Sequence, residues 1–263
     1  MVSLFVLLAF IGAGAAVGIV ASIVKDTDPI DPSNIYDLLD ESSFILDSEG
    51  QIIEKIQTEG YRDIINYTEI PTHLKNAFIA IEDERFKTHN GLDFRRIIGA
   101  AWINFKTGSR QGASTITQQL AKNLYLIPDQ TYTRKIQDMY YALQLEKQLS
   151  KDQILEAYLN TINLGSGAYG VQAASQVYFS KDAQHLTIAE SALIAGIARN
   201  PSRYSSIKTL EKSQLDEEKH EVLDDSDSIY TIIFNDGYQG RQQLVLNTMK
   251  RLGMISETEY KTA

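Results

Sequence analysis

The sequence predicts a mainly helical (all-α) protein with an N-terminal transmembrane helix and a small β-hairpin. Val2 to Val24 contains no charged residue, and about 20 apolar residues are enough to span a bilayer. Beyond Pro71, apolar residues recur at the three- and four-residue spacing of amphipathic helices. Two capping boxes, Ser150 to Gln153 and Thr187 to Glu190, mark the starts of further helices. Polar–apolar alternation is rare, so little strand is expected.

The composition excludes several classes of protein. The net charge over 263 residues is −9, which argues against a nucleic-acid partner. There is no Cys, so disulfide and thiolate chemistry are excluded. The His residues are scattered, and no spacing matches a metal site, a Walker motif or a dinucleotide fingerprint. The candidate chemistry therefore rests on carboxylates and cations.

Composition divides the chain into five segments. Residues 1–25 form the expected transmembrane signal-anchor, and residues 26–43 form an acidic juxtamembrane linker. Residues 44–204 form the main domain, which begins with a hairpin. Residues 205–230 are a charge-dense acidic insert that we expect to be flexible. Residues 231–263 recover a helical pattern.

One carboxylate stands out in the first helix after Pro71. At 100° per residue, Glu82 falls on an apolar arc, four residues after Phe78 and four before Phe86. Its neighbour Asp83 falls on the opposite, outward side. An apolar setting raises the pKa of a carboxyl group toward the range useful in general acid–base catalysis. The alternative is a structural Glu, paired with a Lys or Arg at the edge of the core.

The next expected helix, residues 113–126, follows a basic, glycine-rich loop at 106–112. It carries more hydroxyl and amide groups than a plain surface helix, which indicates a polar ligand. The alternative for the first two of these residues is that they cap the helix. The polar residues are Ser114, Thr115, Gln118 and Lys122.

Residues 134–149 are apolar on more than one side, which predicts a buried central helix. Asp138 is a second carboxylate on this helix, and its alternative role is to pair with Arg134 or Lys135. Two carboxylates suit chemistry at a sugar anomeric carbon. Nearby cations, including Lys122, suit an anionic leaving group such as pyrophosphate. With a membrane anchor, this set predicts glycosyl transfer from a lipid-linked donor.

Four motifs in order resemble those of the peptidoglycan glycosyltransferase domain of class A penicillin-binding proteins and monofunctional transglycosylases. The resemblance covers roughly Phe44 to Tyr204. The motifs are Glu82-Asp83-x-x-Phe86-x-x-His89-x-Gly91, Gly112 to Asn123, Arg134-Lys135-x-x-Asp138, and Leu159-Asn160 to Gly165.

The resemblance implies a lysozyme-like, two-lobed helical domain that polymerises lipid II. The acceptor's 4-hydroxyl would attack C1 of the donor's N-acetylmuramic acid with inversion, and undecaprenyl pyrophosphate would leave. Glu82 matches the general base, and Asp138 occupies a second catalytic position. The remaining matches are expected to bind substrate: Lys122 and Lys135 at the pyrophosphate, Ser114 and Gln119 at the sugar phosphate, and Asp83, Asn123 and Arg134 within the same motifs.

The resemblance also implies a location and partners. The protein would be a single-pass protein of the bacterial cell membrane, with its catalytic domain on the extracytoplasmic side. Its partners would be lipid II, the growing glycan strand, the membrane and other cell-wall synthesis proteins. Some members of the family use a divalent cation, Mg²⁺ or Mn²⁺, as a cofactor. Residues 231–263 resemble the segment that leads to a transpeptidase domain in class A proteins.

Two positions depart from the family pattern, both on the donor side. Position 138 is Asp instead of Glu, and a shift of about 1 Å in a reacting group can cost ~10²-fold in rate. Position 130 is Gln instead of Arg, which removes a charge and a bidentate donor. We therefore expect altered handling of the donor.

Two alternatives to a polymerase are open. A lysozyme-like glycan-cleaving enzyme also needs one key Glu in a helical cleft, but its neutral leaving group needs no cations such as Lys122 and Lys135. A catalytically weak, membrane-anchored scaffold that binds lipid II would be consistent with the substituted donor site.

Overall fold

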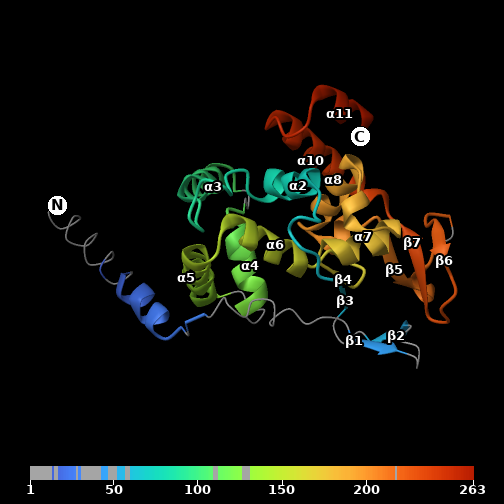
Figure 1. The fold of residues 1–263 in the computed structure, drawn as a ribbon, viewed down its shortest axis with the longest axis horizontal. Helices are drawn as coiled ribbons and strands as arrows, with labels where there is room; N and C mark the ends of the chain where they lie inside the picture. The colour runs from blue at the N-terminus through green and yellow to red at the C-terminus, as the bar shows by residue number, and fades with distance from the viewer. Residues whose placement is uncertain are drawn as a thin grey trace.

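The computed structural model describes residues 14, 17–27, 29–30, 43–46, 52–56, 60–108, 112–125, 131–216 and 218–263. The protein is mainly helical, as predicted, and the helices form a body with a small sheet at one end (Figure 1). The α-helices of the body are α2 (Thr72–Glu82), α3 (Phe94–Thr107), α4 (Ile116–Tyr125), α5 (Tyr132–Gln148), α6 (Lys151–Thr161), α7 (Val171–Phe179), α8 (Ile188–Ile197), α9 (Pro201–Tyr204), α10 (Gln239–Arg251) and α11 (Glu257–Thr262). Short 3-10 turns occupy η2 (Ala183–His185), η3 (Lys212–Gln214) and η4 (Asp236–Tyr238).

The most deeply buried helices are α6 and α8. Every residue of α6 from Ala157 to Thr161 is buried, and so is every residue of α8 from Ser191 to Ile197. The prediction that residues 134–149 form the central helix is wrong, because α5 buries only one face. The buried face carries Tyr141, Ala142 and Leu145, whereas Leu143 on the opposite face is exposed.

The predicted hairpin is confirmed. Strand β1 (Ser43–Leu46) pairs antiparallel with β2 (Ile52–Ile56). A second short pair, β3 (Tyr61–Arg62) with β4 (Ala168–Tyr169), is parallel and ties the start of the domain to the turn before α7.

The N-terminal segment is described only in part. Residues 17–25 are helical, and within the described part of the chain no helix is both long and apolar enough to cross a membrane. Much of the expected anchor, residues 1–13 and 15–16, and the linker at 31–42 lie outside the described residues. Thr27 is held against the body, because Gln137 Nε2 donates to its Oγ1 at 3.3 Å.

The acidic segment at 205–230, which we expected to be flexible, contains regular structure. Strands β5 (Ile207–Glu211) and β6 (Val222–Asp224) flank β7 (Tyr230–Phe234) in an antiparallel sheet of order β5-β7-β6. The acidic residues form turns: Asp227 Oδ1 accepts hydrogen bonds from the N–H groups of Ile229 and Tyr230 at 2.7 and 2.9 Å. These bonds lower the pKa of Asp227. Asp and Ser residues there therefore serve the turn between two strands.

Two glycines, Gly91 of the first motif and Gly170 just before α7, are required by close backbone contacts. Gly91 has φ +87°, and a Cβ there would lie 2.9 Å from the carbonyl oxygen of Ala142 on α5. Gly170 has φ +85°, and a Cβ would lie 2.8 Å from the carbonyl oxygen of Asn160 on α6. Any other residue would strain the backbone at these positive φ angles. Its Cβ would also push the loop away from α5 at position 91 and from α6 at position 170.

Candidate active site

Glu82 is the last residue of α2, and the helix ends there because Asp83 leaves the helical conformation, with φ −157° and ψ 74°. This break changes the direction of both side chains relative to a continuous helix. The Glu82 side chain is 15% exposed, whereas that of Asp83 is fully buried. The prediction that Asp83 faces outward is therefore wrong, and the accessible carboxylate is Glu82.

The two carboxylate oxygens of Glu82 are held by different groups. Gln119 Nε2, on α4, donates to Oε2 at 2.9 Å. An Arg241 Nη atom, on α10, lies 3.7 Å from Oε1. On the backbone, Arg96 of α3 donates to the Glu82 carbonyl oxygen. Three other helices, α3, α4 and α10, therefore fix the position of this one residue.

Tyr158 on α6 orients the Gln119 amide. Its hydroxyl donates to Gln119 Oε1 at 3.1 Å, which leaves the amide N–H₂ directed at Glu82. Burial raises the pKa of Tyr158 well above its usual range, and the charges of Glu82 and Asp83 add to this effect. Tyr158 is therefore a permanent hydrogen-bond donor near neutral pH.

Asp83 links the first motif to the start of helix α4. Its Oδ2 lies 2.9 Å from His89 Nε2 and accepts the N–H of Ile116, the first residue of α4, at 3.0 Å. A carboxylate at a helix N-terminus satisfies free N–H groups and interacts favourably with the helix dipole. Among the described residues its buried Oδ1 has no partner. The motif residue Phe86 is fully buried, so much of this motif builds the core beneath Glu82.

The polar residues at the start of α4 divide into two roles. Thr115 and Gln118 form the helix cap: Thr115 Oγ1 accepts the Gln118 N–H at 3.1 Å, and Gln118 Oε1 accepts the Thr115 N–H at 3.2 Å. Both are buried, so the alternative of capping is confirmed for Thr115. Ser114 points elsewhere, and its Oγ accepts from Lys135 Nζ at 3.1 Å.

A second charged cluster lies at the start of α5. Lys135 Nζ is 3.3 Å from Asp138 Oδ2, so Asp138 pairs with Lys135, as the alternative for this residue anticipated. The Asp138 side chain is 9% exposed, while that of Lys135 is 49% exposed. Asp138 Oδ1 is buried without a hydrogen-bond partner in the described part of the chain. The exposed side of the lysine can therefore bind an external anion, while the Asp138 carboxylate holds the lysine in place from the buried side.

Helix α4 connects the two clusters. Gln119 contacts Glu82, and Ser114, just before the helix, contacts Lys135. Lys122 and Asn123 are exposed further along the same helix, and Arg134 is partly buried beside Lys135. Residues 109–111 and 126–130, including Gln130, lie outside the described residues. Helix α4 and the segment just before it thus carry groups that contact both the accessible carboxylate and the cation.

Arg241 and Tyr158 were not expected from the sequence. Tyr158 lies within the apolar pattern of α6, and this pattern predicts a core residue at that position. Arg241 lies far along the chain from Glu82, in a helix with no motif. Within the described residues, no group of three or more His, Asp and Glu side chains is placed to hold a metal ion.

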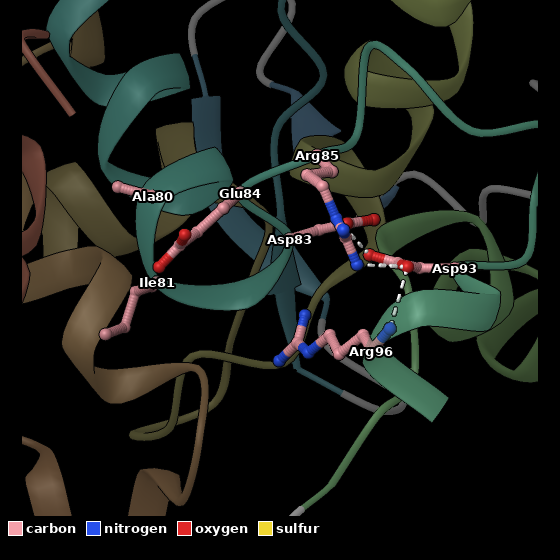
Figure 2. A pocket seen from close by; sticks show the side chains of 7 residues that line it. All are labelled: Ala80, Ile81, Asp83, Glu84, Arg85, Asp93 and Arg96. Carbon is pink, nitrogen blue, oxygen red and sulfur yellow. Dashed lines mark hydrogen bonds and ion pairs between the residues drawn. The ribbon is translucent and has the colours of Figure 1, made fainter. Parts of the chain in front are cut away.

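A hollow of about 360 Å³ lies beside the end of α2, against the start of α3 (Figure 2). One wall is the Arg85–Asp93 pair, in which Arg85 Nε donates to Asp93 Oδ2 at 2.9 Å. Asp93 also caps α3 by accepting the Arg96 N–H at 2.9 Å. Burial acts to raise the pKa of Asp93, but the hydrogen bonds from Arg85 and Arg96 outweigh it and hold that pKa below its usual value. This cap sets the position of Arg96, and through it the Glu82 backbone.

Replacing Asp93 by Ala is expected to lower the free energy of unfolding by about 2 kcal/mol, because α3 loses its cap. The half-exposed Arg85 adds little to this value. Folding lowers the pKa of Asp93. The contribution of Asp93 to the free energy of unfolding is therefore complete above about pH 4, and it is lost as the pH falls through the pKa of Asp93 in the folded state. Urea denaturation at pH 7 and pH 3 measures this difference. Asp93→Asn, which keeps the cap, is the matched control, and an equal loss in both variants would contradict the capping role.

The comparisons with known proteins agree with these motifs. The Transglycosylase family model matches residues 49–227, which includes β5 and β6 and ends before α10. Penicillin-binding protein 1A of Clostridium tetani (strain Massachusetts / E88) is 38% identical over 251 residues, covering 94% of this chain and 29% of that protein. Penicillin-binding protein 1F of Bacillus subtilis (strain 168) is 35% identical over 260 residues, covering 98% of this chain and 34% of that protein. The chain therefore spans about a third of the length of these relatives.

A solved structure was also found. The crystal structure of penicillin-binding protein 1A from Haemophilus influenzae is 22% identical and matches 86% of this chain and 20% of that chain, with a TM-score of 0.39.

Proposed function

The chain belongs to the Transglycosylase family, and on this premise we propose that it is a peptidoglycan glycosyltransferase of bacterial cell-wall synthesis. It polymerises lipid II into β-1,4-linked glycan strands and releases undecaprenyl pyrophosphate. The observation that carries the proposal is the arrangement around α4, which places groups beside both an accessible carboxylate, Glu82, and a half-exposed cation, Lys135. Glycosyl transfer from a pyrophosphate donor requires a base for the acceptor hydroxyl. It also requires a group that stabilises the negative charge developing on the leaving pyrophosphate.

In the proposed reaction, Glu82 takes the proton from the acceptor's 4-hydroxyl as that oxygen attacks C1 of the donor sugar. The bond between C1 and the pyrophosphate oxygen breaks, C1 inverts, and the leaving group departs as a pyrophosphate anion. Lys135 and Ser114 lie together and can hold that anion through a charge and a hydroxyl donor. Lys122, exposed on α4, adds a second cation.

The remaining site residues fall into two groups in this proposal. Gln119 orients Glu82, and Asp83 keeps α2, α4 and the His89 side chain together. Asn123 and Arg134 lie beside the cations and are assigned to substrate binding. Asp138 acts through Lys135, which it holds in place.

The two departures from the family pattern predict slower use of the donor. Asp138→Glu together with Gln130→Arg is expected to raise the rate of lipid II polymerisation by about 10-fold or more, because a longer carboxylate and a restored guanidinium reach the donor side. The measurement is the initial rate with each single variant and the pair. The singles show which position limits the rate, and an unchanged rate in the double variant would make both departures neutral.

An exposed apolar face on α3 supports membrane association of the site. The residues recur at intervals of three or four along this 14-residue helix and share one face. All are exposed, and α3 lies at the outer edge of the body (Figure 1). Such a patch on a monomer marks an interaction surface. The residues are Phe94, Ile98, Trp102 and Phe105.

We place this face against the outer side of the cell membrane, where a lipid-linked donor is held. In this arrangement residues 1–25 are the single-pass signal-anchor, residues 26–43 the linker and residues 44–204 the core of the catalytic domain. The growing glycan strand and other cell-wall synthesis proteins are its further partners.

The test is incubation of the protein with lipid II in detergent or vesicles, followed by separation of glycan chains on a gel. A ladder of polymer supports the proposal. Release of soluble muropeptides from sacculi without polymer from lipid II would instead assign a glycan-cleaving enzyme. Binding of lipid II without turnover, unchanged by Glu82→Gln, would assign a scaffold.

A further inference from the structure

Helix α10 lies against the end of α2 and contacts this region through two ion pairs. It packs against both α8 and α2, which also contact each other (Figure 1). Arg241, near its start, faces Glu82, and Arg251, at its end, pairs with Glu84. The family model match ends at residue 227, so α10 lies outside the residues that this match covers.

The two arginines differ in burial. The Arg241 side chain is 10% exposed, whereas that of Arg251 is 58% exposed. Helix α8 packs tightly against Arg241, because a Cβ on Gly196 would lie 3.2 Å from Arg241 Cγ. Burial lowers the pKa of the Arg241 guanidinium, while the charge of Glu82 acts to raise it and that of Arg199 to lower it. A buried guanidinium contributes little to stability compared with an apolar residue of the same volume, so stability alone does not explain Arg241.

The geometry points to Arg241 as a positioning residue for Glu82, an assignment that rests on the proposed function. Gln119 occupies Oε2 through a 2.9 Å hydrogen bond, while Arg241 faces Oε1 at 3.7 Å. With one group on each oxygen, the rotation of the carboxylate is fixed as well as its place. The longer contact leaves Oε1 as the oxygen that receives the acceptor's proton. The start of helix α10 thus contributes, through Arg241 alone, a positioning residue to the site.

The variants Arg241→Gln, Arg241→Lys and Arg251→Gln, each in the full chain, test this inference. Arg241→Gln is expected to lower kcat for lipid II polymerisation by about 10- to 100-fold, since misplacement of a reacting group by about 1 Å can cost ~10²-fold. KM is expected to stay within about 2-fold, because Arg241 contacts Glu82 and not the donor cations. Arg241→Lys keeps the charge and should recover part of kcat. Arg251→Gln removes only the exposed pair with Glu84 and should leave kcat unchanged.

Three results would overturn the inference: an unchanged kcat in Arg241→Gln, an equal loss in Arg241→Lys, or an equal loss in Arg251→Gln. If Arg241→Gln does not fold, Arg241→Met replaces it, because Met preserves the apolar stem; equal kcat for the Met and Lys variants then overturns the inference. Failure of the proposed function looks different, because the unmodified protein would then make no polymer or Glu82→Gln would retain full activity. Adding Arg241→Gln to Glu82→Gln should lower the residual rate no further, since Arg241 acts through Glu82.

Discussion

Replacing Glu82 by Gln is expected to reduce lipid II polymerisation by about 10²–10⁴-fold, the usual contribution of a general base. The amide has the same shape as the carboxylate but cannot accept the proton of the acceptor's hydroxyl. Gln119 can still donate to the new side-chain oxygen, so the surrounding hydrogen bonds are largely retained. The loss should therefore appear in kcat and not in the folded fraction.

The measurement is the rate of glycan chain formation, with thermal unfolding and lipid II binding recorded for the same sample. Glu84→Gln is the matched control, because Glu84 lies two residues away, is exposed and pairs with Arg251 on the surface. It is expected to polymerise at the rate of the unmodified protein. Equal activity of Glu82→Gln and Glu84→Gln would rule out a general base at position 82.

The partial burial of Glu82 was predictable from the sequence, but its surroundings were not. Helical periodicity placed Glu82 between Phe78 and Phe86, and the structure does hold Glu82 partly buried. The same periodicity placed the Asp83 side chain on the outside. This is wrong because α2 ends at Glu82, so Asp83 is no longer in the helix. A helical wheel assumes a continuous helix, so it fails where a motif lies at the helix end.

Long-range contacts explain the other differences. No local signal connects Arg241 with Glu82, since these residues meet only through the packing of α10 on α2 and α8. The apolar flanks of α5 suggested full burial, but α6 and α8 occupy the centre. Directly after the acidic segment, Thr231 and Ile233 bury one side of β7, while Asp224 and Asp227 of the segment support the turn between β6 and β7. Strand β7 itself carries no charge, but its partner strands β5 and β6 lie within the charge-dense segment, where no strand was expected.

Replacing Lys135 by Met is expected to reduce polymerisation by about 10²–10³-fold, comparable to the loss of one donor that stabilises a developing anion. The substitution removes the group that contacts both Ser114 and Asp138. It also leaves the carboxylate of Asp138, which is 9% exposed, without its cation. A buried charge that loses its partner is destabilising, although the half-exposure of Lys135 reduces the size of this effect. The single variant therefore combines a catalytic and a structural loss.

The double variant Lys135→Met with Asp138→Asn separates the two losses. Removing the unpaired charge is expected to restore the midpoint of urea unfolding toward that of the unmodified protein, while polymerisation stays low. Lys135→Arg is the matched control: it keeps the charge and should retain stability and a larger share of the rate. If the double variant regains activity together with stability, Lys135 serves only to balance Asp138. If stability returns and activity does not, the cation acts on the leaving pyrophosphate, and Asp138 acts by holding it there.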